Sequence, residues 1–380
     1  MATTLLPGWL DSTIRIVRGV WILLVLFLSL FVGSSSFHSP LLLLLWSFSS
    51  RFWRTLNSTF IEMWHTLFIF YLEVWNSKRW LVSGDDVPPK ERAFIISNHP
   101  SEVDWMCWWP IAWRKGMVGD LKVILKKEIA YLPALGNGMD DLEFLFLERD
   151  WEKDKNTVAH RIESWNRDET PLWLTFFPEG TDFNRIKHEK SIKYAAEHNL
   201  PSYRNLLVPR ITGFVSCVKM LGTHIDAIYD FTLCYTGSPK PNPLRALMDL
   251  APKEVHLHIR RYPISTIPLN DDEKLKDWIF QCWKEKDELL DHFKQHQRFP
   301  DSKQGGGAVE LKPSRLLYAW FLWWLSLISL ALYRCVASPG FLLLVVAATA
   351  VRVATTYHTK TRQWRGLLPP DDYAAGKKQE

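Results

Sequence analysis

The chain has 380 residues and a formal net charge of +5, with 46 Lys and Arg against 41 Asp and Glu. This length allows one large domain or two ordinary ones. The small excess of positive charge argues against a nucleic-acid binder, although it suits a surface near anionic lipid headgroups. The five cysteines are scattered and lack the spacing of metal ligands, so we expect free thiols and no bound metal.

Near the start of the chain, apolar sequence predicts a membrane anchor. Residues 16–32 form a run about long enough to cross a bilayer, with Arg15 and Arg18 at its beginning. A second run at 41–48 is too short to cross alone. We expect both runs to form a retained anchor, with a cleaved signal peptide as the alternative for the first. Residues 60–75 carry charges among apolar positions and predict an amphipathic helix lying on the membrane.

The other end of the chain predicts a transmembrane hairpin. Residues 316–333 are apolar and rich in tryptophan, residues 338–340 predict a turn, and residues 341–351 form a shorter apolar run. The glycines at 305–307 predict a linker ahead of this hairpin. The chain is therefore expected to divide into an N-terminal membrane anchor with its amphipathic helix (1–79), a soluble core (80–304), and a linker, hairpin and tail (305–380).

Lys377 and Lys378 occupy the fourth and third positions from the end of the chain. Lysines at these positions look like the dilysine signal that returns membrane proteins to the endoplasmic reticulum, and the alternative is an ordinary charged tail. Because a membrane hairpin precedes them, we favour the signal. This interpretation predicts a protein of the endoplasmic reticulum membrane whose soluble core faces the cytosol.

In the soluble core, strand-like and helix-like segments alternate. Strands are predicted at residues 93–97, 172–177, 206–208, 231–235 and 255–259. Helices are predicted at residues 152–166, 187–198 and 272–294. Such alternation predicts an α/β fold, a mostly parallel sheet flanked by helices, with N-terminal membrane-anchoring helices and a C-terminal transmembrane hairpin.

Polar residues follow three of these strands at the point where each strand ends. They lie in residues 98–104, 178–181 and 209–210. Since active sites of α/β sheets collect just beyond the carboxyl ends of the strands, we expect His, Asp, Glu and Arg side chains to converge at one rim.

His99 and Asp104 are the most informative pair in these segments. Pro100 disfavours a continuous helix between them, but a turn followed by a helix from Ser101 would return Asp104 toward the imidazole. The carboxylate would then orient the histidine and stabilise its protonated form. The alternative is a capping box, Ser101-x-x-Asp104, in which Asp104 only caps the start of a helix.

Four blocks, in order, resemble the glycerolipid acyltransferase family. The first is Asn98-His99-x4-Asp104, and the third, about eighty residues later, is Phe177-Pro178-Glu179-Gly180-Thr181. Lys126-Lys127-Glu128 and Phe146-Leu147-Glu148-Arg149 look like the second block, and Val208-Pro209-Arg210 looks like the fourth. The longer stretches that begin at Arg149 and Pro209 look like the eukaryotic lysophosphatidic acid and lysocardiolipin/lysophosphatidylinositol acyltransferase branch.

This resemblance implies that residues 80–304 form an acyltransferase catalytic domain. It would move an acyl chain from acyl-CoA to the free hydroxyl of a lysophospholipid at a membrane bilayer, without a cofactor. His99 would act as the general base, because a hydroxyl is a poor nucleophile at neutral pH and histidine has a pKa near 7. Asp104 would orient the imidazole, and no covalent acyl-enzyme is required.

The resemblance also implies a set of substrate-binding residues. Arg149, with Lys126 behind it, is the candidate for the acceptor phosphate, since a guanidinium binds phosphate in bidentate fashion; a surface ion pair is the alternative for Arg149. Gly180 lets the backbone approach the ligand and Thr181 can donate to it, while Glu179 is expected to hold a cation or the loop itself. Asn98 and Pro209 complete the set.

One position departs from the family pattern. Many relatives carry arginine directly after the threonine of the third block, whereas this chain has Asp182. A carboxylate there would repel a phosphate monoester. It favours a bulkier acceptor, such as lysophosphatidylinositol or a lysocardiolipin-like lipid, or a cation supplied by Arg185 or Lys187.

Three other functions remain alternatives. Acylation of glycerol-3-phosphate is disfavoured because the longer blocks look like the lysolipid branch. A non-catalytic lipid-binding membrane scaffold is disfavoured because His99, Asp104 and the other motif residues are all present. A hydrolase in which His99 activates water lacks the Gly-x-Ser-x-Gly elbow in the sequence.

Overall fold

The computed structural model describes residues 8–32, 50–131, 135–148, 150–237, 240–301 and 307–364. Its centre is an eight-stranded sheet with the order β4-β3-β5-β2-β6-β7-β1-β8. The strands are β1 (Arg79–Gly84), β2 (Ala93–Ser97), β3 (Leu121–Lys126), β4 (Leu145–Leu147), β5 (Trp173–Phe176), β6 (Ala227–Tyr235), β7 (Glu254–Pro263) and β8 (Val309–Glu310).

Most neighbouring strands run parallel, which confirms the predicted α/β fold with a mostly parallel sheet. Among the described strands, the β6–β7 and β1–β8 pairs are antiparallel and the other five pairs are parallel. β2 lies in the middle of the sheet and all five of its residues are buried, as expected for a parallel strand that is covered on both faces. β8 follows the predicted boundary at residue 304, so the third predicted segment adds a strand to the sheet.

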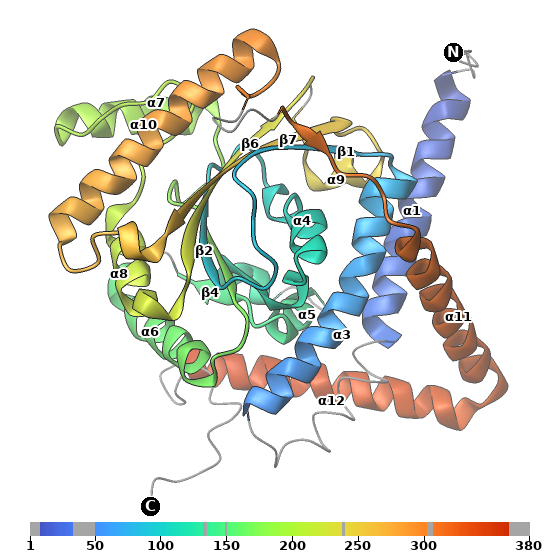
Figure 1. Cartoon of the computed structure of the whole chain (residues 1–380). Coiled ribbons are helices and arrows are strands. Elements are labelled where there is room, and N and C mark those ends of the chain that lie inside the picture. Colours follow the sequence, from blue (N-terminus) through green and yellow to red (C-terminus); the bar gives the residue numbers. More distant parts are fainter. Residues whose placement is uncertain are drawn as a thin grey trace, which may run out of the picture.

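Helices cover both faces of the sheet (Figure 1). On one face lie α6, α8 and α10, and on the other lie α3 and α4. The helices are α1 (Gly8–Val32), α3 (Ser50–Phe70), α4 (Trp109–Arg114), α5 (Leu135–Asp141), α6 (Trp151–Asp168), α7 (Arg185–Glu197), α8 (Ile211–Leu221), α9 (Pro243–Leu247), α10 (Asp272–His296), α11 (Arg315–Ala337) and α12 (Pro339–Trp364).

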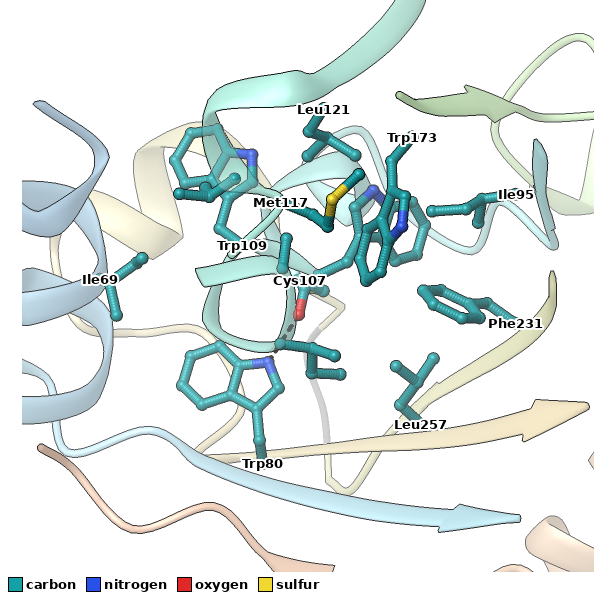
Figure 2. Packing of buried hydrophobic residues seen from close by; sticks show 14 of the residues in the cluster. Ile69, Trp80, Ile95, Cys107, Trp109, Met117, Leu121, Trp173, Phe231 and Leu257 are labelled. Atoms are coloured by element: carbon teal, nitrogen blue, oxygen red, sulfur yellow. Dashed lines mark hydrogen bonds between the residues drawn. The ribbon is translucent and has the colours of Figure 1, made fainter. Parts of the chain in front are cut away.

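The two faces of β2 bury different side chains because successive residues of a strand point to opposite sides. Phe94 and Ile96 belong to the core beneath α6, α8 and α10. Ile95 belongs to the opposite core, where Trp173 and Phe231 pack close to it (Figure 2). With both faces covered, β2 is held firmly, and its carboxyl end places the next residues at the edge of the sheet.

Two described helices are long and apolar enough to cross a membrane, at Leu10–Ser29 in α1 and Arg315–Ala337 in α11. Pro339–Val351 of α12 is a shorter apolar segment, and Figure 1 shows α12 diverging from α11 at the predicted turn. The predicted run at 41–48, the first two glycines of the linker and the dilysine lie outside the described residues.

The predicted amphipathic segment at 60–75 forms the second half of α3 and a following helical turn, Tyr71–Trp75. Its apolar side packs on the core and on α11. Phe70 stacks on Phe321 with 4.1 Å between ring centroids, and Trp324 Nε1 donates to the Met63 carbonyl at 2.9 Å. α3 thus joins the sheet to α11.

One predicted strand is wrong: residues 206–208 form irregular backbone. Side chains satisfy this backbone in place of a neighbouring strand. Glu179 accepts the Leu207 N–H at 3.0 Å and Ser191 Oγ accepts the Val208 N–H at 2.9 Å. Trp283 Nε1 donates to the Leu207 carbonyl at 3.1 Å. The third predicted cluster of polar residues therefore reaches the site from a loop.

Candidate active site

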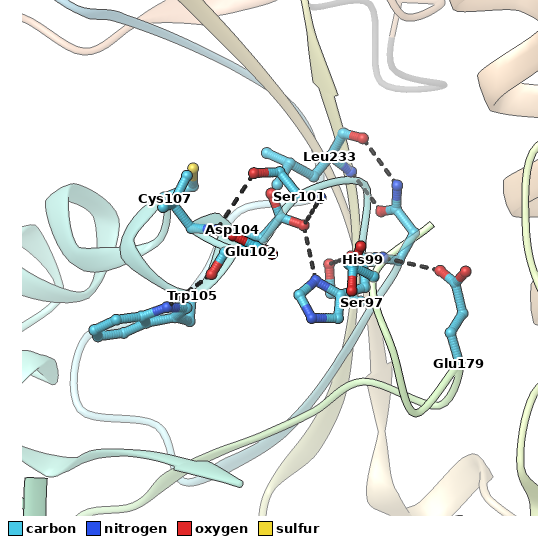
Figure 3. A network of polar contacts seen from close by, with 12 residues as sticks. Ser97, His99, Ser101, Glu102, Asp104, Trp105, Cys107, Glu179 and Leu233 are labelled. Carbon is cyan, nitrogen blue, oxygen red and sulfur yellow. Dashed lines mark hydrogen bonds and ion pairs between the residues drawn. The ribbon is translucent and has the colours of Figure 1, made fainter. Parts of the chain in front are cut away.

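The site is built around His99, on the loop that leaves the carboxyl end of β2 (Figure 3). His99 Nδ1 lies 3.0 Å from Asp104 Oδ2, and the same oxygen accepts the Ser101 N–H at 2.7 Å. The helix expected from Ser101 is one short turn, Asp104–Met106. One carboxylate oxygen therefore holds both the imidazole and the Ser101 N–H, whereas the turn Asp104–Met106 begins after Val103 without a side-chain cap.

The bond to Asp104 determines which nitrogen of His99 can act as a base. When Nδ1–H donates to the carboxylate, Nε2 keeps its lone pair. No described residue forms a hydrogen bond with Nε2, and the side chain is 15% exposed. The ring stacks on Phe177, with 4.2 Å between ring centroids. The geometry therefore leaves Nε2 available as a hydrogen-bond acceptor.

Asp104 is completely buried. Burial raises the pKa of its carboxyl, while hydrogen bonds from His99, Tyr235 and Ser101 act in the opposite direction. The donors around this carboxylate thus decide whether it stays ionised beside His99.

Glu179 fastens the loop after β5 to the His99 loop. Its Oε1 accepts the His99 N–H at 2.9 Å and its Oε2 accepts the Leu207 N–H at 3.0 Å. Holding the loop is one of the two roles expected for this residue. Burial raises the pKa of Glu179 to about 7, although both backbone hydrogen bonds oppose that shift. The Phe183 N–H donates to the His99 carbonyl at 2.7 Å and closes the same loop from the other side.

Asn98 and Pro209, both predicted to contact substrate, stand next to the site as links between segments. Asn98 Nδ2 donates to the Leu233 carbonyl at 2.9 Å, and Asn98 Oδ1 accepts the Leu233 N–H at 2.8 Å. Its amide is therefore occupied by β6. Pro209 is buried, and the next residue donates its N–H to the Pro178 carbonyl at 2.7 Å, which ties the fourth block to the third.

Lys187 supplies a cation beside Asp182. Its Nζ donates to Asp182 Oδ1 at 2.6 Å and to Thr181 Oγ1 at 2.8 Å. Burial alone would raise the pKa of Asp182, but Lys187 holds it below its ordinary value. Arg185, the other cation considered, is 92% exposed and pairs with Glu189. Lys187 therefore offsets the charge with which Asp182 would repel a phosphate.

Gly180 and Arg210 approach each other closely at the rim of the site. Gly180 has a φ of +69°, a conformation that favours glycine. A Cβ at this position would lie 2.6 Å from Arg210 Nε and 2.9 Å from Arg210 Cδ, so the arginine side chain crosses directly over the glycine backbone. Arg210 is exposed, and no described carboxylate pairs with it. It is a cation beside the third block that is free to meet an anion.

Of Lys126 and Arg149, the predicted phosphate ligands, only Lys126 can be placed, on an outer strand of the same sheet. Lys126 ends β3 and is exposed, and it pairs in register with Leu147 of β4. Within the described residues, no hydrogen bond or ion pair joins Lys126 to the His99 loop. Arg149 itself lies outside the described residues.

Comparison with known proteins identifies the family. The family model described as "Acyltransferase" matches residues 79–235, and the one described as "Acyltransferase C-terminus" matches residues 246–324. The chain is 38% identical over 290 residues to probable 1-acyl-sn-glycerol-3-phosphate acyltransferase 5 of Arabidopsis thaliana, covering 76% of this chain and 77% of that protein. The chain belongs to the acyltransferase family. It is an acyltransferase of the 1-acylglycerol-3-phosphate acyltransferase type, and the resemblance in its motifs is confirmed.

Other relatives of this acyltransferase are named lysocardiolipin acyltransferases. The chain is 34% identical to lysocardiolipin acyltransferase 1 of Gallus gallus, covering 73% of each chain. Among solved structures, the 1-acyl-sn-glycerophosphate acyltransferase PlsC of Thermotoga maritima aligns with 72% of this chain and 98% of that chain. Its sequence identity is 17% and its TM-score is 0.42.

Sequence reasoning did not assign two residues of this acyltransferase site. Tyr235, the last residue of β6, donates its hydroxyl to Asp104 Oδ1. It ends a predicted strand, so its place at the carboxyl edge of the sheet was an available signal. Arg210 was expected at the rim but was given no binding role, because its approach to Gly180 depends on tertiary structure that residue spacing does not reveal.

Proposed function

We propose that this acyltransferase moves an acyl chain from acyl-CoA to the free hydroxyl of a lysophospholipid, with His99 as general base and Asp104 as its orienting carboxylate. One observation carries the proposal. Nδ1 of His99 is held 3.0 Å from Asp104, while Nε2 has no partner among the described residues. A histidine held in this arrangement can accept a proton from a substrate hydroxyl.

In the proposed reaction, the acceptor hydroxyl gives its proton to His99 Nε2 as its oxygen attacks the thioester carbonyl. Asp104 stabilises the imidazolium that forms. The new C–O bond forms and the C–S bond breaks, and the imidazolium returns the proton to the departing CoA sulfur. The step balances without a covalent acyl-enzyme or another reactant.

We place the phosphate of the acceptor at the rim formed by Gly180, Thr181 and Arg210. Arg210 crosses Gly180 and lacks a carboxylate partner among the described residues, which supports a role in binding an anion. Lys187 supports it by neutralising Asp182. Lys126 and Arg149 remain proposed phosphate ligands, and 1-acylglycerol-3-phosphate is the first acceptor to test, followed by lysophosphatidylinositol and lysocardiolipin-like lipids.

We further propose that the enzyme is held in a membrane of the endoplasmic reticulum. α1 and α11 have the length and composition of membrane spans, and both leave much of their apolar surface exposed, for example at Leu24 and Val336. The location rests on Lys377 and Lys378, and the catalytic domain would face the cytosol.

The test is an assay of the purified protein with acyl-CoA and a panel of acceptors, in which CoA release and acylated lipid are both measured. We expect acylated lipid and free CoA to appear in equal amounts, only when a lysophospholipid is present. Transfer to glycerol-3-phosphate and to no lysophospholipid would show that the proposed acceptor is wrong. CoA release without an acceptor would indicate a hydrolase, and no reaction with well-folded protein would favour the lipid-binding scaffold.

A further inference from the structure

Every oxygen of the buried Asp104 carboxylate has a donor. Oδ2 accepts hydrogen bonds from His99 Nδ1 and the Ser101 N–H, whereas Oδ1 accepts one from the hydroxyl of Tyr235. A buried carboxylate stays ionised only when hydrogen bonds replace the water that it has lost. The donor to Oδ1 comes from a different element, β6, and lies outside the four motif blocks.

We propose that Tyr235 is a positioning residue of the catalytic pair, whose hydroxyl keeps Asp104 ionised and directed at His99. This inference rests on the proposed role of His99 as general base. The Tyr235 hydroxyl bonds to Asp104 and not to His99, so it acts through Asp104.

The fold places Tyr235 accurately for this role. It is the last residue of β6, and its backbone is paired with Val255 of β7. Two residues earlier in β6, the N–H and the carbonyl of Leu233 both form hydrogen bonds with the side-chain amide of Asn98. Asn98 directly precedes His99 in the chain. The Asn98 clamp therefore fixes the end of β6 against the His99 loop, and the Tyr235 hydroxyl against Asp104.

The direction of the hydrogen bonds follows from the chemistry of the groups. The Tyr235 oxygen also lies 3.2 Å from Cys107 Sγ. Burial beside Asp104 raises the pKa of Tyr235 well above its ordinary value, and burial raises the pKa of the Cys107 thiol. Both groups therefore stay protonated. Tyrosine donates its single proton to the carboxylate, which can only accept, and the thiol can donate to the tyrosine oxygen.

Removing this hydroxyl has a predictable effect on the titration of the pair. Without it, Oδ1 is a buried, unpaired anionic oxygen, so the His99–Asp104 pair binds a proton more readily. Besides His99, the titratable groups described near Asp104 are Cys107 on its own segment, Cys234 of β6, and Lys240 on the loop after β6, whose charge favours the ionised carboxylate. None of them replaces the lost donor, and the acid limb of the kcat–pH profile should move to higher pH.

β6 offers a matched control for this experiment. Tyr229 lies on the same strand, and its hydroxyl also donates to a carboxylate, that of Glu91. The two tyrosines are six positions apart, which places their α-carbons about 20 Å apart along the strand. Tyr229→Phe thus removes the same kind of bond from the same strand without touching Asp104.

The experiment compares Tyr235→Phe and Tyr229→Phe in the full-length protein by thermal unfolding, kcat, KM and the pH profile of kcat. For Tyr235→Phe we expect kcat to fall roughly tenfold with little change in KM, and the acid limb to rise by up to about one pH unit. Tyr229→Phe should lose stability but keep the wild-type profile. The proposal is overturned when Tyr235→Phe keeps the wild-type kcat and profile, or when both variants lose activity only in step with stability.

A second substitution keeps the test decisive when Tyr235→Phe folds poorly. 3-Fluorotyrosine at position 235 retains the hydroxyl and makes it a stronger donor, so the acid limb should move to lower pH; an unchanged limb would contradict the inference. Failure of the wild-type protein to transfer any acyl chain would instead refute the proposed function, so the two failures are distinguishable.

Discussion

At the scale of single residues, the rim of the site depends on the contact between Gly180 and Arg210. The glycine has no Cβ, and this allows the arginine side chain to cross its backbone. The guanidinium thereby lies beside Gly180, and the next residue, Thr181, accepts a hydrogen bond from Lys187 at 2.8 Å; we propose that the acceptor phosphate binds at this rim. Acceptor binding should therefore be more sensitive to Arg210 than acyl-CoA binding.

Arg210→Ala is expected to raise KM for the lysophospholipid by roughly 10- to 100-fold, because a charge-assisted hydrogen bond to the phosphate is lost. KM for acyl-CoA should change little. Arg204→Ala is the matched control, since Arg204 lies in the same irregular segment but is 84% exposed in its side chain and pairs with Asp291. A selective rise in KM for acyl-CoA would place the CoA phosphates at this rim, and no change in either constant would remove Arg210 from the site.

At the scale of elements, a buried ionic cluster fastens α3 to the catalytic domain. Glu143, after α5, accepts from Arg54 of α3 at 2.9 Å and lies 3.4 Å from Lys122 of β3 and from Arg161 of α6. Arg54 also donates to the carboxylate of Asp168. Burial would raise the pKa of Glu143, but the surrounding cations outweigh it and lower the pKa to about 2.

Glu143→Gln should destabilise the protein by about 3 kcal/mol, because Arg54 and Lys122 are left buried without their shared anion. The folded pKa of Glu143 lies below the unfolded value of 4.5, so its stabilisation is present above about pH 4.5 and is lost as the pH falls toward 2. Thermal unfolding in detergent at pH 6 and about pH 3.5 measures both effects.

The exposed Glu152, 76% accessible and paired with Lys155, provides the control for this substitution. Glu152→Gln should leave the unfolding temperature nearly unchanged, since surface ion pairs contribute little. Equal unfolding temperatures for wild type and Glu143→Gln at pH 6 would show that the cluster does not fasten α3.

The elements also show what sequence patterns can predict. β2 and β5 were predictable because buried parallel strands are short apolar runs, and each was followed directly by its motif residues. Residues 206–208 have the same apolar character but obtain their hydrogen bonds from side chains of α7, α10 and the Glu179 loop. β3 was not predicted as a strand. It contains the charged Lys122, which is nevertheless buried because it pairs with Glu143. Such partners are distant in sequence and no local pattern reveals them.

The residues of the site also divide into those that a local sequence pattern predicts and those that only the tertiary structure brings together. His99, Asp104 and Glu179 lie within short motifs, and the structure joins them by hydrogen bonds. Tyr235 and Arg210 enter only through tertiary approach, so spacing within the motifs does not predict their contacts. The two interpretations of Asp104, capping residue or partner of His99, are geometrically compatible because Oδ2 accepts the Ser101 N–H and also lies 3.0 Å from His99 Nδ1.

At the scale of the whole molecule, α1 is attached to the catalytic domain along its first half. Arg18 donates to the Trp75 carbonyl at 2.7 Å, and Trp21 stacks on Trp75 with 4.9 Å between ring centroids. Arg15 donates to the Asp249 carbonyl at 3.2 Å, beyond α9. These contacts favour the retained anchor over a cleaved signal peptide for this segment.

The same region connects the proposed membrane helices with the active site. α9 follows the loop after β6, where the Pro241 carbonyl accepts the Ser101 hydroxyl at 2.6 Å. On its other side, α9 packs so closely on α1 that a Cβ at Gly19 would lie 3.0 Å from the Leu247 carbonyl oxygen. The His99 loop and α1 therefore contact the same short connection, which supports a site close to the membrane that supplies its lipid acceptor.

The central claim is that His99 removes the proton from the acceptor hydroxyl during transfer. The most direct measurement is single-turnover formation of acylated lipid from acyl-CoA and the best acceptor by wild type, His99→Ala and the surface control His160→Ala. His99→Ala is expected to retain the fold and substrate binding, while transfer falls roughly 100- to 10,000-fold. His160→Ala should match wild type. Transfer by a well-folded His99→Ala variant at the wild-type rate would contradict the account.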